Sequence, residues 1–233
     1  MRNEVQGFNT IEQFITDDGG VLLVDKFVDW TSFDVVNKIR SMFHLRKVGH
    51  AGTLDPLATG LLILCSNKMT KSIHIYQEEE KEYTGTFVLG AVTASYDTAT
   101  ESQNIKSVQG ISDEFIRMNA QKFIGTITQI PPMYSAAKVG GKKLYELARK
   151  GKEIERKPKE ITISAFNIHW TELPEIDFLV TCSKGTYIRS LVHDLGQELG
   201  CGAYLKNLRR TRIGTYNLDE AWTIDSLKEH PVN

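Results

Sequence analysis

The stretch Gly49–Gly60 constrains this chain more than any other, because three glycines and a proline there surround a single carboxylate. Glycine allows backbone conformations that are closed to other residues, and proline pushes the residue before it into extended geometry. We therefore expect Asp55, which precedes Pro56, to be held in one backbone pose. The apolar run Leu61–Cys65 predicts a short buried strand, which would give the carboxylate a rigid support.

Composition indicates a globular protein. The 233 residues allow one large domain, and 41% hydrophobic with 24% charged residues are ordinary values for such a chain. The three cysteines form no Cys-x-x-Cys pair, which argues against a zinc site and against a disulfide framework. The acidic N-terminal segment does not resemble a signal peptide, and no apolar run is long enough for a membrane helix. We expect a single cytoplasmic domain over residues 1–233 that holds no metal and meets no membrane.

The net charge of −1 hides a polarised distribution. Residues 138–159 carry nine basic side chains against three acidic ones. Such a run is more often a solvated face than a nucleic-acid site, and charge alone leaves both interpretations open.

Periodicity predicts a mixture of helices and strands. Thr31–Asp34 is typical of a helix start, and the helix is expected to continue to Phe43. The other expected helices cover 68–77, 113–123, 142–150 and 188–199, and the expected strands cover 21–24, 83–89, 161–168 and 176–182, the last two paired antiparallel.

Two stretches, Gly49–Gly60 and Ser183–Ser190, resemble the diagnostic motifs of the TruB-type tRNA pseudouridine synthases. The resemblance extends to segments 21–26, 83–97, 129–147 and 183–210. It implies an α+β pseudouridine synthase fold: a long mixed, mostly antiparallel sheet with surrounding helices and a basic thumb insertion at about 129–159. The chain departs from the family at Phe27, where proline is usual. It also departs in the sequence of Thr93–Asp97, where threonine-aspartate-threonine is usual. Many family members carry a C-terminal PUA domain, a small RNA-binding domain, and we expect none in this chain.

The resemblance also implies a reaction. The enzyme would isomerise uridine 55 (tRNA numbering) in the T-arm hairpin of tRNA to pseudouridine. We expect a monomer, although the resemblance leaves the oligomeric state open. This isomerisation breaks the bond from C1′ to N1, turns the uracil and rejoins it through C5. It requires a carboxylate beside the sugar and base, but no cofactor and no metal.

Asp55 is the expected nucleophile, and attack at C6 of the ring or at C1′ of the ribose both stay open. A buried carboxylate needs a cationic partner to remain charged, and Arg189 is the candidate because a guanidinium can bind a carboxylate with two hydrogen bonds. An extruded uridine needs an aromatic surface, for which Tyr83 and Tyr187 are the candidates. Tyr83 is also a possible relay for the proton lost from C5, although a strand tyrosine more often only packs.

By resemblance, further side chains would contact the substrate: His50, Asp97, Leu208, Lys26, Lys142 and Lys143. A loop histidine such as His50 is about as often a purely structural residue. A glycosidase would need two paired carboxylates, and the sequence offers no second one near Asp55. The remaining alternative is a non-catalytic RNA-binding module on the same scaffold.

Overall fold

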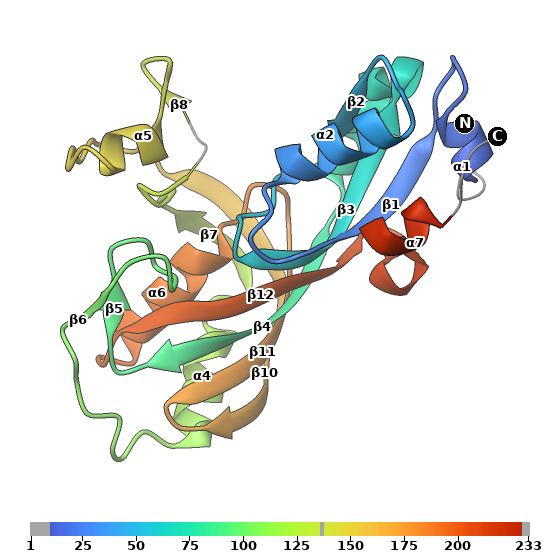
Figure 1. Ribbon diagram of the computed structural model, residues 1–233. Coiled ribbons are helices and arrows are strands. Elements are labelled where there is room, and N and C mark those ends of the chain that lie inside the picture. Colours follow the sequence, from blue (N-terminus) through green and yellow to red (C-terminus); the bar gives the residue numbers. More distant parts are fainter. Residues whose placement is uncertain (1–9, 136–137, 230–233) are drawn as a thin grey trace. The chain divides into compact units, whose positions relative to one another are not determined.

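The computed structural model describes residues 10–135 and 138–229, except for the side chains of residues 138, 139, 142 and 143 (Figure 1). The chain divides into two compact units. Unit 1 comprises Met1–Lys81 and Arg209–Asn233, and unit 2 comprises Glu82–Leu208. The boundary falls inside strands β4 (Lys81–Leu89) and β12 (Ala203–Ile213). The single domain expected over residues 1–233, without a PUA domain, remains a prediction.

The sheet of unit 1 is built on two long apolar strands. Strand β1 (Val21–Lys26) pairs antiparallel with β3 (Ala58–Ser66), with Val21 opposite Cys65. The short strand β2 (Val48–His50) pairs with the end of β3, and β13 (Tyr216–Asn217) pairs with the end of β12. Both strands predicted in this unit are therefore confirmed, and each is longer than its apolar run.

Both faces of β1 and β3 are covered, which explains why their sequences are almost continuously apolar. One face packs against α1 (Ile11–Phe14), α2 (Ser32–Met42) and α7 (Ile224–Lys228). The other face packs against residues of η1 (Asn67–Ser72) and α3 (Ile73–Glu78), including the buried Tyr76. The short helix η2 (Leu218–Glu220) follows β13.

The start of α2 matches the sequence prediction. The hydroxyl of Thr31 accepts a hydrogen bond from the amide of Asp34 (3.1 Å), and the carboxylate of Asp34 accepts one from the amide of Thr31 (2.8 Å). This reciprocal capping box satisfies amides that the first helical turn leaves without partners.

In unit 2 the strand order is β12, β4, β11 (Glu175–Cys182), β10 (Lys159–Glu172) and β7 (Gly125–Gln129). Strands β10 and β11 pair antiparallel, as predicted, and β10 also pairs antiparallel with β7. Helix α4 (Asp113–Gln121) contacts β10 and α6 (Ile188–Glu198). The rings of Phe87 and Phe166 both contact Phe178 in the core between these elements.

The thumb insertion differs in part from its prediction. Strands β8 (Lys138–Val139) and β9 (Lys142–Lys143) form a hairpin across Gly140 and Gly141, which have φ of +58° and +80°. Two successive positive φ angles are what a two-residue hairpin turn requires. The predicted helix from Lys142 was therefore wrong at its start: α5 covers only Leu144–Ala148.

The expected fold class is confirmed. Helices are interspersed with strands along the chain, and the ladders named above are antiparallel rather than parallel. The strands β5 (Val92–Thr93) and β6 (Ser102–Gln103) form a further antiparallel pair. Parallel pairing occurs at the isolated bridges Val24–Trp222 and Asp97–Leu205, so the α+β fold is mixed and mostly antiparallel.

Candidate functional site

The loop that carries Asp55 connects β2 and β3 in unit 1. Asp55 is half-buried, and its carbonyl oxygen accepts a hydrogen bond from the amide of Ala58 (3.0 Å). Gly60 follows at φ +102°, where an added Cβ would lie 2.3 Å from the backbone oxygen of Arg210. Only glycine fits this position, so a close backbone approach fixes the end of the loop.

The side chain of Lys26 is fully buried and holds the same loop. Its ammonium donates hydrogen bonds to the carbonyl oxygens of Phe27 (2.8 Å), Trp30 (2.6 Å) and Pro56 (3.2 Å). Burial lowers the pKa of Lys26 to about 8, and the negative charge of Asp55 opposes this shift. Lys26 therefore ties the residue that follows Asp55 to the end of β1.

Two further buried polar side chains hold the loop. Arg210, which is 1% exposed, donates from Nε to the carbonyl oxygen of Leu61 (2.7 Å) and from Nη2 to that of Gly52 (3.2 Å). The hydroxyl of Ser32 accepts a hydrogen bond from the amide of Leu54 (2.8 Å). The sequence prediction gave neither residue a role in the site. Arg210 ends the segment 183–210 that resembles the family, and Ser32 was considered only as part of a helix start.

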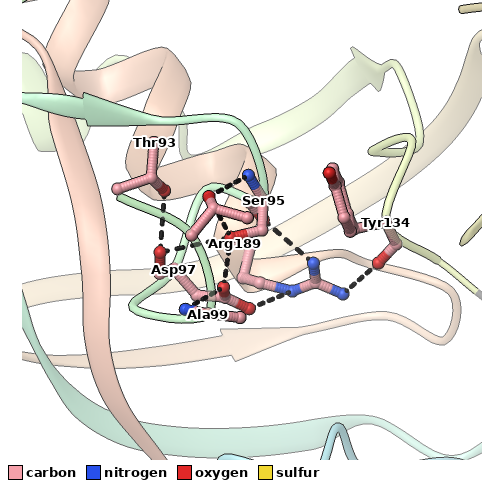
Figure 2. Close-up of polar contacts among 7 residues, drawn as sticks. Thr93, Ser95, Asp97, Ala99, Tyr134 and Arg189 are labelled. Atoms are coloured by element: carbon pink, nitrogen blue, oxygen red, sulfur yellow. Dashed lines mark hydrogen bonds and ion pairs between the residues drawn. The ribbon is translucent and has the colours of Figure 1, made fainter. Parts of the chain in front are cut away.

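The second polar cluster surrounds Asp97 in a turn of unit 2 (Figure 2). One carboxylate oxygen of Asp97 accepts hydrogen bonds from the hydroxyl of Ser95 (2.5 Å) and from the amide of Ala99 (2.9 Å). Its backbone oxygen accepts a hydrogen bond from the hydroxyl of Thr93 (2.7 Å). Asp97 thus holds its own turn by the local side-chain bonding that short polar residues favour.

Arg189 joins this cluster from the first turn of α6 (Figure 2). Its Nε lies 3.5 Å from the second carboxylate oxygen of Asp97. Its Nη1 donates to the carbonyl oxygen of Ser95 (3.0 Å), and its Nη2 donates to that of Tyr134 (2.8 Å). The side chain of Arg189 is only 5% exposed. The structure therefore brings two predicted site residues, Arg189 and Asp97, together in one buried ion pair.

Gln129 fixes the residue that precedes α6. Its amide group donates to the carbonyl oxygen of Tyr187 (3.1 Å), and its side-chain oxygen accepts from the amide of Tyr187 (2.8 Å). Gln129 is 2% exposed, and Tyr187 is half-buried. The sequence prediction named Tyr187 but gave Gln129 no role, because a glutamine at the end of a strand has no distinctive pattern.

The other predicted site residues are distributed over both units of the chain. Tyr83 on β4 and Leu208 on β12 are each 8% exposed and belong to unit 2. His50, at the end of β2 in unit 1, is half-buried; burial lowers its pKa, and its Nδ1 has no hydrogen-bond partner within the described residues. The side chains of Lys142 and Lys143 lie outside the described part of the chain. Unit 1 carries Lys26, His50 and Asp55, and unit 2 carries Tyr83, Asp97, Lys142, Lys143, Tyr187, Arg189 and Leu208.

Residues 10–135 and 138–229 contain no group of three or more histidine, cysteine, aspartate or glutamate side chains placed to hold a metal ion. Over the same residues, the protein has no helix with the length and apolar character that a membrane span requires.

Comparison with solved structures shows the fold. The chain is similar to one in a crystal structure of a Cbf5-Nop10-Gar1 complex, with a TM-score of 0.74 and 30% identity, over 97% of this chain and 59% of that chain. It is also similar to a chain in an H/ACA RNP bound to a substrate RNA containing 2′-deoxyuridine, with a TM-score of 0.70 and 27% identity, over 95% and 55% of the two chains. This protein therefore spans less than two thirds of either solved chain.

Comparison of sequences defines the family. Residues 40–188 match the N-terminal domain of TruB family pseudouridylate synthases, and residues 189–232 match the tRNA pseudouridylate synthase B C-terminal domain. Among curated relatives, tRNA pseudouridine synthase B of Chlorobaculum tepidum is 48% identical over 91% of each chain. That of Flavobacterium johnsoniae is 46% identical over 94% of this chain and 98% of its own.

The fold and the matched sequence define a pseudouridine synthase. The chain belongs to the TruB family of pseudouridylate synthases. The family and the enzyme class, an isomerase acting on tRNA, agree with the resemblance found in the sequence.

Proposed function

We propose that this protein converts uridine 55 in the T arm of tRNA to pseudouridine, with Asp55 as the nucleophile. Family membership and the names of the curated relatives support a tRNA substrate. The observation that carries the assignment of Asp55 is the loop around it: buried Lys26, Arg210 and Ser32 hold that loop through its backbone. Such support preorganises a reactive group.

The reaction redistributes bonds within one nucleoside. The bond from C1′ to N1 breaks, a bond from C1′ to C5 forms, C5 loses its proton and N1 gains one. Asp55 attacks either C6 of the ring or C1′ of the ribose. The bond that it forms breaks again before release, so that both routes regenerate the carboxylate and give the same product. No electron is gained or lost overall, so the proposed chemistry needs no redox partner.

Other residues are assigned supporting roles. Arg189 is proposed as the cation that keeps Asp55 ionised, because a guanidinium has donors beyond those that bind one carboxylate. Tyr83 and Tyr187 are proposed to stack on the extruded uracil, with Tyr83 as the proton relay at C5. His50, Asp97, Leu208 and Lys26 are proposed to support the substrate or its pocket, and Lys26 does so through the loop backbone. The monomeric state and the cytoplasmic location also remain proposals.

The direct test is incubation of the purified protein with an unmodified tRNA transcript, followed by mapping of pseudouridine along the RNA. Pseudouridine at position 55 alone is the expected result. A transcript with cytidine at position 55 is the matched control and should remain unmodified. Binding of the transcript without conversion would support the non-catalytic RNA-binding module instead, and conversion at another position would refute the site assignment.

The basic thumb insertion is proposed to contact RNA phosphates. Lys150 is exposed just after α5, and Lys142 and Lys143 lie in β9. Replacing all three by alanine should weaken tRNA binding, and the slope of log affinity against log salt should become shallower by about 2 to 3. Filter binding at several salt concentrations measures both effects. Replacement of the three lysines by arginine is the charge-matched control, and equal slopes for the alanine and arginine variants would remove the thumb from RNA binding.

A further inference from the structure

Tyr96 has a backbone conformation that needs an explanation. It lies between Ser95 and Asp97, in the turn that holds Arg189, and its φ is +64°. Bulky side chains rarely adopt a positive φ, because their Cβ then crowds the neighbouring carbonyl group. Such a conformation persists only where surrounding contacts impose it.

One contact that helps to hold this conformation is a ring stack. The ring of Tyr96 lies on the imidazole of His193, with centroids 3.8 Å apart and an angle of 15° between the planes. Both side chains are half-buried, and Nδ1 of His193 makes no hydrogen bond within the described residues. The principal specific contact of the imidazole is therefore the face that it offers to Tyr96.

The stack joins the same two segments as the ion pair. His193 lies four residues after Arg189 on α6, so the two side chains project from neighbouring turns of one helix face. On the opposite segment, Ser95 and Asp97 contact the guanidinium, and Tyr96 between them contacts the imidazole. The turn is thus attached to α6 at two levels: polar contacts at Arg189 and ring contacts at His193.

The backbone of Tyr96 is fixed as well. Its amide donates to the carbonyl oxygen of Thr93 (3.2 Å), and its carbonyl oxygen accepts from the amide of Leu205 on β12 (2.9 Å). With the backbone held on one side and the ring on the other, a shift of Tyr96 would move the flanking Ser95 carbonyl and Asp97 carboxylate. Those two groups, together with the carbonyl oxygen of Tyr134, are bound by the guanidinium of Arg189.

We propose that the Tyr96–His193 stack positions Arg189 for the isomerisation. Tyr96 and His193 are positioning residues in this scheme, since they act through the turn and through α6 and need not touch the RNA. The inference rests on the proposed function of Arg189 at the reacting uridine. It predicts that loss of the stack slows the chemical step and leaves tRNA affinity unchanged.

The test is single-turnover pseudouridine formation with saturating enzyme, together with tRNA binding. Tyr96→Gly removes the ring and accepts the positive φ, whereas Tyr96→Phe keeps the ring and removes only the hydroxyl. From the helix, His193→Ala removes the stack and favours the helical backbone, whereas His193→Phe keeps an aromatic ring. All variants are assayed well below their melting temperatures, beside the unaltered protein.

We expect Tyr96→Gly and His193→Ala each to lower the single-turnover rate about tenfold or more, because small misplacements of a positioned group are costly. Their tRNA affinities should stay within about twofold. The double variant should be no slower than the slower single variant, because residues in contact are not additive. Both phenylalanine variants should retain most of the rate.

The proposal fails if Tyr96→Gly and His193→Ala keep the full rate, or if they lose tRNA affinity instead of rate. It also fails if Tyr96→Phe is as slow as Tyr96→Gly, since the hydroxyl would then carry the effect. Absence of pseudouridine at position 55 with the unaltered protein would refute the proposed function itself, so the two failures are distinguishable.

Discussion

The two carboxylates, Asp55 and Asp97, lie in loops that are held in opposite ways. The loop of Asp55 is held through its backbone, by side chains of Lys26, Arg210 and Ser32 that come from other segments. The turn of Asp97 is held through the carboxylate itself, which accepts hydrogen bonds within the turn and pairs with Arg189. Replacing a reactive side chain should leave the contacts that hold its loop intact, whereas replacing a structural side chain should remove such contacts. The comparison thus distinguishes Asp55, a carboxylate proposed to take part in the reaction, from Asp97, a carboxylate that stabilises its own turn.

The largest expected effect is that of Asp55→Asn. The substitution keeps the shape of the side chain and leaves the contacts of Lys26 and Arg210 with the loop backbone in place. Single-turnover pseudouridine formation should fall at least about 1,000-fold, because an amide is a poor nucleophile. Melting temperature and tRNA affinity should change little. A variant that still forms pseudouridine would remove Asp55 from the mechanism.

Asp97→Asn should lower both the stability of the protein and the rate of pseudouridine formation. The amide oxygen can still accept from Ser95 and Ala99, but the buried charge of Arg189 loses its pairing with this carboxylate. We expect a loss of about 1–3 kcal/mol in the free energy of unfolding and a smaller loss of rate than for Asp55→Asn. Denaturant titration and single-turnover kinetics measure the two quantities. A variant as stable as the parent would contradict the architectural role of Asp97.

Lys26→Met tests the support of the first loop. It leaves the carbonyl oxygens of Phe27, Trp30 and Pro56 without the ammonium, which should cost about 1–3 kcal/mol of stability. Lys38→Met, at an exposed position on α2, is the control and should change stability by less than about 0.5 kcal/mol.

The stability difference between the parent and Lys26→Met should also depend on pH. Because the pKa of Lys26 is about 8 in the folded protein and 10.5 is its ordinary value, the unfolded chain binds more protons between these pH values. Stability contributed by this group therefore rises with pH across that interval. The stability difference between the parent and Lys26→Met should thus grow from pH 7.5 to pH 9.5, as measured by denaturant titration. A constant or shrinking difference would contradict the burial of the ammonium.

The smallest effect is expected at Asp194, which is half-buried on α6. Burial raises the pKa of its carboxyl to about 6. The folded protein therefore binds the proton more tightly than the unfolded chain between about pH 4 and pH 6, and stability from this group falls as pH rises through that interval. Asp194→Asn cannot ionise, so it should be more stable than the parent at pH 7.5, and the difference should shrink at pH 4.5. Thermal melts at both pH values decide this, and a parent that is more stable at pH 7.5 would contradict it.

The sequence predicted most elements whose pattern is local. The apolar runs that became β1 and β3, the capped start of α2 and the paired strands β10 and β11 all appear in the structure. Strand β12 could not be predicted in this way. Its sequence is polar, and a buried arginine, Arg210, occupies an inward position. A buried arginine needs acceptors for its N–H groups, and for Arg210 these are carbonyl oxygens of distant segments, at Gly52 and Leu61.

The sequence predicted only those site residues that belong to the motifs of the family. The ion pair of Arg189 with Asp97 appears in the structure, although the sequence prediction assigned Arg189 to Asp55 and Asp97 to the substrate. The assignment of Arg189 to Asp55 remains a prediction. Residues that support the site through backbone atoms, such as Gln129, gave no signal, because their partners are carbonyl and amide groups that every residue possesses.

Unit 1 consists of two stretches of chain separated by the whole of unit 2, and this has a consequence for synthesis on the ribosome. One of the side chains that hold the Asp55 loop is Arg210, which binds the carbonyl oxygen of Gly52 and lies more than 150 residues after it in the sequence. During translation, the loop therefore emerges early, and its contact with Arg210 can form only after nearly the entire polypeptide has been made. A nascent chain stopped after Leu208 would contain all of unit 2 and Asp55, the proposed nucleophile, but not the guanidinium of Arg210 that binds the Asp55 loop.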